Sequence, residues 1–311
     1  MDLTKIFVNL KRFDVPRKMG GVCSKQNPEE WIKWVMDECV NLGLGKLDGI
    51  DVIFLLPEGL ILTAVNKLKE YSDEKIRTLK IGVQGVFRED VKIGGNFGAF
   101  TSNLPAAAAR NMGCTWTMIG HSEERKDKLG VIEAFEPGYK QNPDTLHRAA
   151  VAVNNLINEE VICALERDMN VLLCVGETAE ERGEGPFEEQ QPRIRESLKL
   201  QLEIGLKGVE KYKGQSDIVI GYEPIWAIGP GKIPPGPEYI SFVSSYIKEV
   251  VKEKYQFDPV VVYGGGLKEE NAGVISKIPT IGGGLVALTR FTGEIGFNPE
   301  ELKKIIDKYI E

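Results

Sequence analysis

Residues 217–223 read Asp-Ile-Val-Ile-Gly-Tyr-Glu, a short apolar run that ends on a carboxylate. Its β-branched residues are typical of a buried strand. Similar runs occur at 5–10, 50–56, 79–86, 115–120, 171–175, 259–263 and 284–288. Longer segments with helical periodicity or helix-start signals lie between them. The sequence therefore predicts eight strands that alternate with roughly eight helices.

Strict alternation of strands and helices predicts a parallel sheet, because each helical crossover returns the chain to the same edge. The runs are apolar on both faces, as expected for strands buried on both sides. Eight such units close into a barrel. An open, doubly wound sheet is the alternative, but no G-x-G-x-x-G follows residues 5–10. We expect an α/β fold, a (β/α)8 barrel with residues 1–311 as one domain and polar residues 126–144 as an inserted loop.

Composition restricts the function further. The chain has 311 residues and a net charge of −7, which argues against nucleic acid as a partner because phosphate backbones need a basic surface. No apolar run reaches ~18 residues, so no membrane span is expected, and the N-terminus shows no signal-peptide pattern. The five cysteines form no C-x-x-C pair. A disulfide framework or a zinc site is therefore not expected, and a reducing compartment, the cytoplasm, is favoured.

Polar residues follow several of the predicted strands. Asn9 and Lys11 lie at the end of 5–10, His121 and Glu123 follow 115–120, and Glu223 follows 217–222. Active-site groups of (β/α)8 barrels lie at the C-terminal ends of the strands. A carboxylate, an imidazole, a cation and the glycine-rich loop 264–266 suit proton abstraction next to a carbonyl in a phosphorylated substrate.

Six segments resemble, in order, motifs of the triosephosphate isomerase family. They are Asn9-Leu10-Lys11, Gly98-Ala99-Phe100-Thr101, Gly120-His121-Ser122-Glu123-Glu124-Arg125, Cys174-Val175-Gly176-Glu177-Thr178, residues 222–232 and Tyr263-Gly264-Gly265. They extend across most of the chain, and six matches in order are far more specific than one. The resemblance implies the barrel fold, isomerase activity in glycolysis and gluconeogenesis, a small phosphorylated sugar as substrate, and a homodimer.

The resemblance also implies roles for individual residues. Glu223 would be the general base, and a neutral His121 would donate to the carbonyl oxygen as the enediolate forms. Lys11 would stabilise negative charge and hold the phosphate. Asn9 would help to orient the carbonyl. Glu123 would support the site by pairing with Lys11, although a purely structural ion pair fits equally well. No metal or organic cofactor is implied, because the reaction only moves protons.

Further substrate contacts are expected at loops that follow the strands. Gly229 belongs to a lid at 224–232, whose glycines allow unusual backbone angles and whose closure would exclude water from the enediolate. The remaining expected substrate-binding residues are Gly265, Gly266, Ala287 and Leu288.

The chain departs from the family pattern at positions that bear on substrate choice. Gly266 replaces a serine, and Ala287-Leu288 replace a Gly-Gly pair, so the phosphate loses a hydroxyl donor and close backbone approach is less free. Arg290 would compensate with a charged fork, or is an ordinary surface arginine. The other departures are Phe13 for Asn, Glu124 for Arg, Pro230 at the lid tip, and extra length near 126–144 and 86–97, the latter in the region of the dimer loop.

Three functions fit these observations. The first is interconversion of dihydroxyacetone phosphate and glyceraldehyde 3-phosphate. The second is the same proton transfer on another small sugar phosphate, such as a tetrulose phosphate, which the altered phosphate loops favour. The third is a barrel that binds phosphorylated metabolites without turnover, and the presence of Lys11, His121 and Glu223 argues against it.

Overall fold

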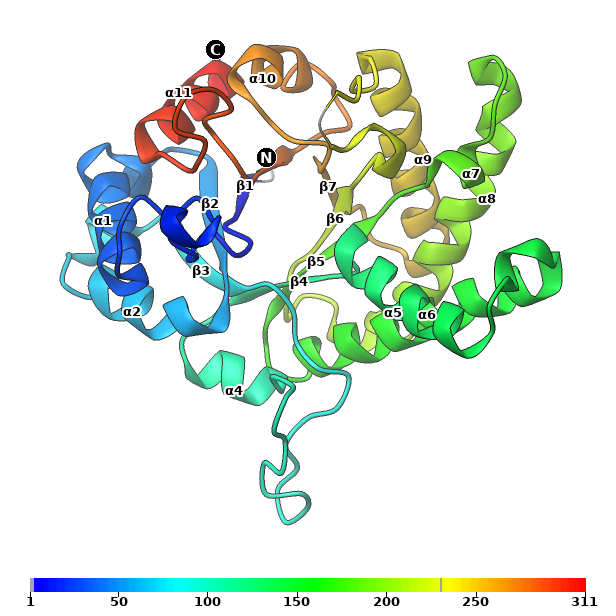
Figure 1. Cartoon of the computed structure of the whole chain (residues 1–311), viewed down its shortest axis with the longest axis horizontal. Helices are drawn as coiled ribbons and strands as arrows, with labels where there is room; N and C mark the ends of the chain where they lie inside the picture. The colour runs from blue at the N-terminus through cyan, green and yellow to red at the C-terminus, as the bar shows by residue number, and fades with distance from the viewer. Residues whose placement is uncertain (1–2, 230) are drawn as a thin grey trace.

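The computed structural model describes residues 3–229 and 231–311, and eight parallel strands in it form a closed barrel (Figure 1). The strands are β1 (Thr4–Asn9), β2 (Ile50–Leu56), β3 (Leu79–Val83), β4 (Trp116–Ile119), β5 (Asn170–Val175), β6 (Ile218–Tyr222), β7 (Val260–Tyr263) and β8 (Gly283–Val286). Closure is made by β1, which pairs with β2 on one side and with β8 on the other. The predicted (β/α)8 barrel is confirmed.

Helices surround the barrel (Figure 1). Those of the described residues are α1 (Pro28–Asn41), α2 (Glu58–Leu68), α3 (Asp73–Ile76), α4 (Ala106–Asn111), α5 (Ser122–Phe135), α6 (Pro143–Leu165), α7 (Ala179–Arg182), α8 (Phe187–Gly205), α9 (Pro237–Tyr255), α10 (Glu269–Ile275) and α11 (Pro299–Ile310). The helix starts expected at Asn27 and Asn298 are present, and each asparagine side chain accepts a backbone N–H of the first turn. Proline follows both caps, where its missing N–H costs nothing.

Two apolar cores follow from the alternation of side chains along the strands. The inner core fills the barrel and includes Phe7, Ile53, Trp116, Leu172 and Val219. The outer core lies between the strands and the helices, where neighbours of those residues such as Ile6 and Val8 point. The interior of the barrel is therefore filled by side chains up to the C-terminal ends of the strands, where polar residues replace apolar ones.

The prediction of an inserted loop at 126–144 is wrong for most of that stretch. Helix α5 runs through it as far as Phe135, and a short 3-10 turn covers Tyr139–Gln141. Glu and Lys, which are good helix formers, are frequent in α5. The polarity of α5 reflects a solvent-exposed helix surface, and Arg125 is the one buried residue of this helix.

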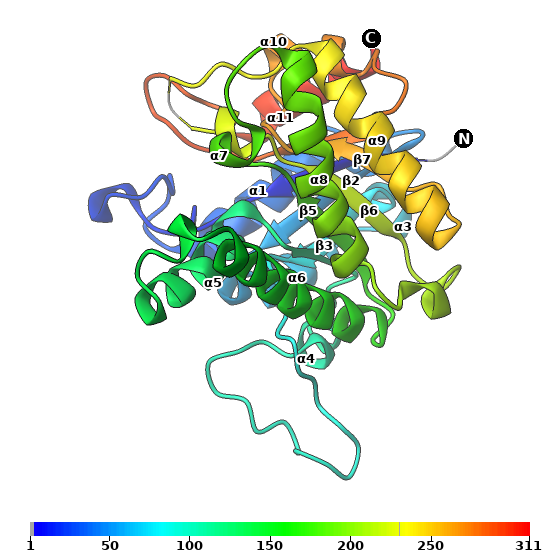
Figure 2. The ribbon, with the colours of Figure 1, turned by 90° about the vertical axis from the view of Figure 1, so that its right-hand side faces the viewer.

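The strand expected at 79–86 is too long, because β3 ends at Val83. Residues 84–105 form a long loop that extends away from the barrel (Figure 2). Its base is fixed by Asp90, whose carboxylate pairs with Arg167 and accepts the backbone N–H of Ala107 at 3.0 Å. The tip carries two highly exposed apolar side chains, Ile93 and Phe97.

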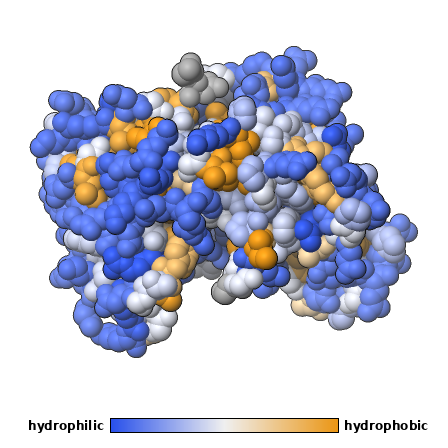
Figure 3. Space-filling view, turned by 90° about the horizontal axis from the view of Figure 1, so that it is seen from above, coloured by the Kyte–Doolittle hydropathy of each residue, from blue (hydrophilic) through white to orange (hydrophobic). Residues whose placement is uncertain are grey.

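Two further long loops contact each other at the edge of the barrel. Residues 10–27 connect β1 to α1, and residues 287–298 connect β8 to α11. An ion pair of 2.9 Å between Arg17 and Glu294 joins them. No helix among the described residues is long and apolar enough to span a membrane. On the face shown in Figure 3, hydrophilic residues predominate and apolar ones form small separate patches.

Candidate active site

Glu223 stands where β6 ends, on the face of the strand that looks into the barrel. Val219 belongs to the inner core, and Glu223 lies four residues further along, so the same alternation directs its side chain to the mouth of the barrel. The residue is only 2% exposed. Its Oε2 accepts the backbone N–H of Ser122 at 3.0 Å, and its Oε1 accepts the Ser122 hydroxyl at 3.3 Å. The carboxylate is thus buried and held by donors from the loop after β4.

His121 caps helix α5 and points at this carboxylate. Its Nδ1 accepts the backbone N–H of Glu123 at 3.3 Å, which requires a ring nitrogen without a proton. The ring proton is therefore assigned to Nε2. Nε2 lies 3.2 Å from Oε1 of Glu223. With its proton on Nε2, the neutral imidazole donates toward the Glu223 carboxylate.

The first turn of α5 fixes the backbone that carries His121. Gly120 has a positive φ of 76°, and a Cβ there would lie 2.8 Å from the carbonyl oxygen of Cys174. The Gly120 N–H donates to Oε2 of Glu124 at 2.7 Å, and Nε of the buried Arg125 donates to the Gly120 carbonyl at 2.7 Å. Glu124 therefore takes a structural role at a position where an arginine was expected.

Lys11 reaches the same site from the loop after β1. Its backbone is held at a positive φ of 40°, and its N–H donates to Oδ1 of Asn9 at 2.9 Å. Gln84, directly after β3, donates to the carbonyl of Lys11 at 2.9 Å and to Asn9 Oδ1 at 3.3 Å. Asn9 is buried at the mouth of the barrel. These contacts stabilise an unusual backbone conformation that directs the ammonium group.

An ion pair joins Lys11 to Glu123, with 2.5 Å between Nζ and Oε1. Partial burial opposes ionisation of Glu123, but the hydrogen bond and the charge of Lys11 outweigh it and lower the pKa of this carboxyl. The Nδ1 atom of His121 lies 3.9 Å from the other carboxylate oxygen of Glu123. The lysine, the imidazole and Glu223 are thus linked in one cluster at the ends of β1, β4 and β6.

The segment after β6 is anchored through Glu177, which lies after β5. One oxygen of this buried carboxylate, Oε1, accepts Trp226 Nε1 at 2.8 Å, the Tyr239 hydroxyl at 2.7 Å and the Tyr222 hydroxyl at 3.0 Å. Burial raises the pKa of Glu177, although these donors act in the opposite direction. The Arg182 guanidinium lies 3.9 Å above the Trp226 ring. Gly229 is exposed with a φ of 123°, and Pro230 lies outside the described residues.

The expected phosphate loops lie at the same end of the barrel, after β7 and β8. A Cβ on Gly264 would lie 2.9 Å from Cγ of Glu223, so this loop contacts the carboxylate closely. Gly265 and Gly266 follow, and Gly266 has a φ of 92°. Ala287 and Leu288 are half-buried against the outer core. In the described part of the chain no side-chain hydrogen bond or ion pair joins these four residues to His121 or Lys11.

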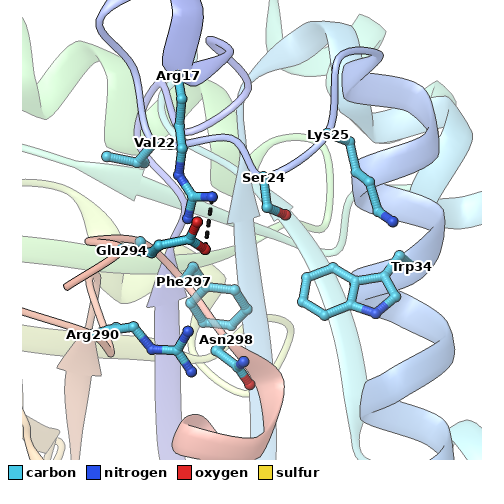
Figure 4. Close-up of a pocket in the computed structure, with 10 residues that line it drawn as sticks. Arg17, Val22, Ser24, Lys25, Trp34, Arg290, Glu294, Phe297 and Asn298 are labelled. Carbon is cyan, nitrogen blue, oxygen red and sulfur yellow. Dashed lines mark hydrogen bonds and ion pairs between the residues drawn. The ribbon is translucent and has the colours of Figure 1, made fainter.

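Arg290 pairs with a carboxylate of the last helix. Its Nε donates to Glu301 of α11 at 2.8 Å, and the side chain lines a cavity at the edge of the barrel (Figure 4). Among the described residues, no group of three or more His, Cys, Asp or Glu is arranged to hold a metal.

The fold and these side chains define a class, the (β/α)8 barrels with a charged site at the C-terminal strand ends. The family model for triosephosphate isomerase matches residues 50–307. The chain belongs to the triosephosphate isomerase family, which confirms the resemblance seen in the sequence.

Relatives and a solved structure agree with this assignment. Triosephosphate isomerase of Chloroherpeton thalassium is 31% identical over 232 residues, which cover 73% of this chain and 75% of that protein. The protein of the same name from Syntrophotalea carbinolica is 28% identical over 82% of this chain and 83% of its own length. The crystal structure of triosephosphate isomerase from Bartonella henselae is similar in fold, with a TM-score of 0.65, 19% identity and 99% of each chain covered.

Some residues of the site are not predicted by the sequence analysis. Gln84 directly follows β3 and could have been found by the same strand-end rule that identified Asn9 and Glu223. The strand predicted at 79–86 runs past this position, so Gln84 does not appear as a strand-end residue in the sequence. Ser122 lies in a motif, but its contact with Glu223 joins residues 101 positions apart and has no sequence signal. The same holds for Trp226 and Glu177.

Proposed function

We propose that this chain is an aldose–ketose isomerase that interconverts dihydroxyacetone phosphate and glyceraldehyde 3-phosphate. The 3.2 Å approach of His121 Nε2 to Glu223 Oε1 carries this proposal, because it brings a base and a ring N–H donor together at one point of the barrel mouth. Membership of the triosephosphate isomerase family supports it.

The reaction needs one proton to move between adjacent carbons. Glu223 takes a proton from the carbon next to the carbonyl, and His121 Nε2–H donates to the carbonyl oxygen as it gains negative charge. Glu223 then returns a proton to the neighbouring carbon. His121 gives its Nε2 proton to the carbonyl oxygen and takes the proton of the neighbouring hydroxyl, so that the two oxygens exchange roles. The contact between His121 and Glu223 has to open so that the substrate carbonyl lies between them. Lys11 supplies positive charge to the enediolate and to the phosphate.

The substrate phosphate would lie against Gly265, Gly266, Ala287 and Leu288, because loops after the seventh and eighth strands form phosphate sites in this class of barrel. Gly229 of the lid after β6 would contact it from the other side. Asn9 would orient the carbonyl and Glu123 would hold Lys11. These residues need neither a metal nor an organic cofactor for a proton transfer.

A second substrate class is a longer sugar phosphate, such as a tetrulose phosphate. Gly266 offers no hydroxyl, and the side chains of Ala287 and Leu288 stand where a Gly-Gly pair would leave the backbone open. These differences favour a phosphate that binds in a shifted position. A barrel that binds metabolites without turnover is a weaker alternative.

Purified protein assayed with triose phosphates and with tetrulose phosphates separates these functions. Turnover of dihydroxyacetone phosphate with the higher kcat/KM supports the proposal. A higher kcat/KM for the tetrulose phosphate supports the second class. Binding of both without turnover would identify a non-catalytic barrel.

We also propose that residues 1–311 act as one domain in a cytoplasmic homodimer. The protruding loop 84–105 supports the dimer, because Ile93 and Phe97 at its tip are apolar and exposed. The five cysteines are all free thiols, which fits a reducing compartment. Light scattering of the wild type and of Phe97→Ser tests the dimer, which the serine is expected to weaken.

A further inference from the structure

The edge of the barrel carries a cavity of about 300 Å³ between two long loops. It is lined by Arg17, Ser24 and Lys25 of the β1–α1 loop, by Trp34 of α1, and by Arg290, Glu294 and Phe297 of the β8–α11 loop. Figure 4 shows Arg17 and Arg290 on one side, Lys25 and Trp34 on the other, and Phe297 between them. We propose that this cavity binds a small phosphorylated metabolite at a second site, distinct from the site at the ends of β1, β4 and β6.

The charge of the lining favours an anion. Three cations, Arg17, Lys25 and Arg290, line the cavity with one carboxylate, Glu294, and a second carboxylate, Glu301, pairs with Arg290 from behind. This excess of positive charge occurs on a chain whose net charge is −7. In the described part of the chain no carboxylate forms an ion pair with Lys25. Guanidinium forks and ammonium groups are the side chains that bind phosphate most strongly.

Glu294 holds the place that a ligand anion would take. Its carboxylate pairs with Arg17 at 2.9 Å, but the side chain is 72% exposed. An exposed pair of this kind contributes little, so a phosphate dianion displaces the carboxylate readily. Arg290 is fixed from behind by Glu301, through Nε, which leaves its terminal nitrogens for a ligand. A phosphate would thus replace the Glu294 carboxylate as the partner of Arg17.

The floor of the cavity is apolar and rigid. Phe297 is buried and packs edge-on against Phe54 of β2, with 6.3 Å between ring centroids. The half-buried Trp34 adds a second aromatic side chain. A bare inorganic ion would not use these surfaces, whereas the carbon skeleton of a metabolite would cover them. A volume of about 300 Å³ is at the lower end of ligand pockets, which suits a small metabolite and excludes a dinucleotide.

The position of the cavity links it to the candidate active site. Lys11 belongs to one of the two loops, and Ala287 and Leu288 belong to the other. A ligand that bridges the loops would therefore alter the KM for the substrate. The binding itself does not depend on which reaction the site catalyses.

Isothermal titration of the full-length protein with phenyl phosphate and with inorganic phosphate tests the proposal. Phenyl phosphate is expected to bind more tightly than inorganic phosphate at this site. Lys25→Gln and Arg17→Gln are each expected to weaken its binding by about tenfold or more, the usual effect of losing a charge-assisted hydrogen bond. Glu294→Gln is expected to strengthen it, and such a gain cannot result from misfolding.

Lys18→Gln is the matched control, because Lys18 is an exposed cation of the same loop that does not line the cavity. Lys11→Met removes a cation from the candidate active site and is expected to leave binding at the second site unchanged. If the Lys25, Arg17 and Glu294 variants all bind phenyl phosphate as Lys18→Gln does, the proposal is overturned. Equal affinity for the two probes would overturn the assignment of an organic ligand.

Discussion

The imidazole of His121 and the carboxylate of Glu223 face each other at the mouth of the barrel, 3.2 Å apart, although 102 positions separate them in the chain. Their strands, β4 and β6, are not neighbours, since β5 lies between them. The curvature of the closed barrel and the inward side-chain alternation bring them together. Ser122 holds the carboxylate from the same loop that presents the imidazole. Any function of this site depends on that arrangement.

Shortening the base tests its placement. Glu223→Asp is expected to lower kcat for isomerisation by at least ~100-fold, because general-base catalysis depends on the distance between the base and the proton. Steady-state kinetics with the favoured substrate measures this effect. Glu188→Asp, on the exposed surface of α8, is the control and should leave kcat unchanged. Full activity of Glu223→Asp would exclude this residue from the mechanism.

Removing the ammonium group of Lys11 should weaken substrate binding and slow turnover together. Lys11→Met is expected to lower kcat/KM by at least about tenfold, since a charge-assisted hydrogen bond to phosphate or to the enediolate is lost. Lys126→Met, on the exposed side of α5, serves as the matched variant with no expected loss. The account of Lys11 fails if both variants retain wild-type kcat/KM.

A buried charge cluster behind the site predicts a pH-dependent stability. Lys128 pairs with Glu124 at 2.6 Å and with Glu160 at 2.9 Å. Burial, together with the neighbouring Glu124, raises the pKa of Glu160 to about 9. The folded protein therefore holds a proton that the unfolded chain releases, and the free energy of unfolding should fall as the pH rises from ~5 to ~9.

Glu160→Gln isolates this effect. The variant is expected to remove at least about 1 kcal/mol of the decrease in unfolding free energy between those pH values, because it cannot titrate. Urea unfolding at a series of pH values measures it. Glu159→Gln, the neighbouring residue on α6, should keep the wild-type pH dependence. Parallel curves for wild type and Glu160→Gln would show that Glu160 does not hold the extra proton.

The anchor of the segment after β6 predicts a stability effect at Tyr239. Its hydroxyl donates to Oε1 of Glu177 at 2.7 Å, and the acceptor is buried. Tyr239→Phe is expected to lower the free energy of unfolding by about 1 kcal/mol, as for other hydrogen bonds lost at a buried acceptor. Tyr212→Phe loses an exposed hydroxyl contact with Glu166 and should change stability by less than about 0.5 kcal/mol. Equal effects in chemical denaturation would argue against the anchor.

The barrel could be predicted from the sequence because its signals are local. Each strand is a short apolar run, and the N-cap residues Asn27 and Asn298 predict the helices that follow them. Helix α5 was not predicted, because its one buried residue is the charged Arg125 and it lacks the buried apolar face that marks most helices. Propensity, which favours a helix there, is a weaker signal than periodicity.

The strand-end residues of the candidate site could be predicted from the sequence, but the residues that hold them in place could not. Glu223, His121 and Lys11 follow strands, and the fold places strand ends together. Gln84 follows a strand as well, but its contact with Lys11 and the contact of Ser122 with Glu223 join distant segments and appear only in the folded structure. The long loops at 10–27 and 287–298 are joined by the ion pair between Arg17 and Glu294. Neither loop carries a sequence signal that predicts this pair.

The most direct test of the central claim is exchange of substrate hydrogen with solvent. The protein is incubated with dihydroxyacetone phosphate in D2O, and proton NMR follows the carbon next to the carbonyl. If Glu223 shuttles the proton, the wild type forms aldose with deuterium at the former carbonyl carbon and returns ketose with deuterium at the carbon that lost its proton, whereas Glu223→Gln incorporates none above the rate without protein. Deuterium incorporation by Glu223→Gln at the wild-type rate would contradict the account.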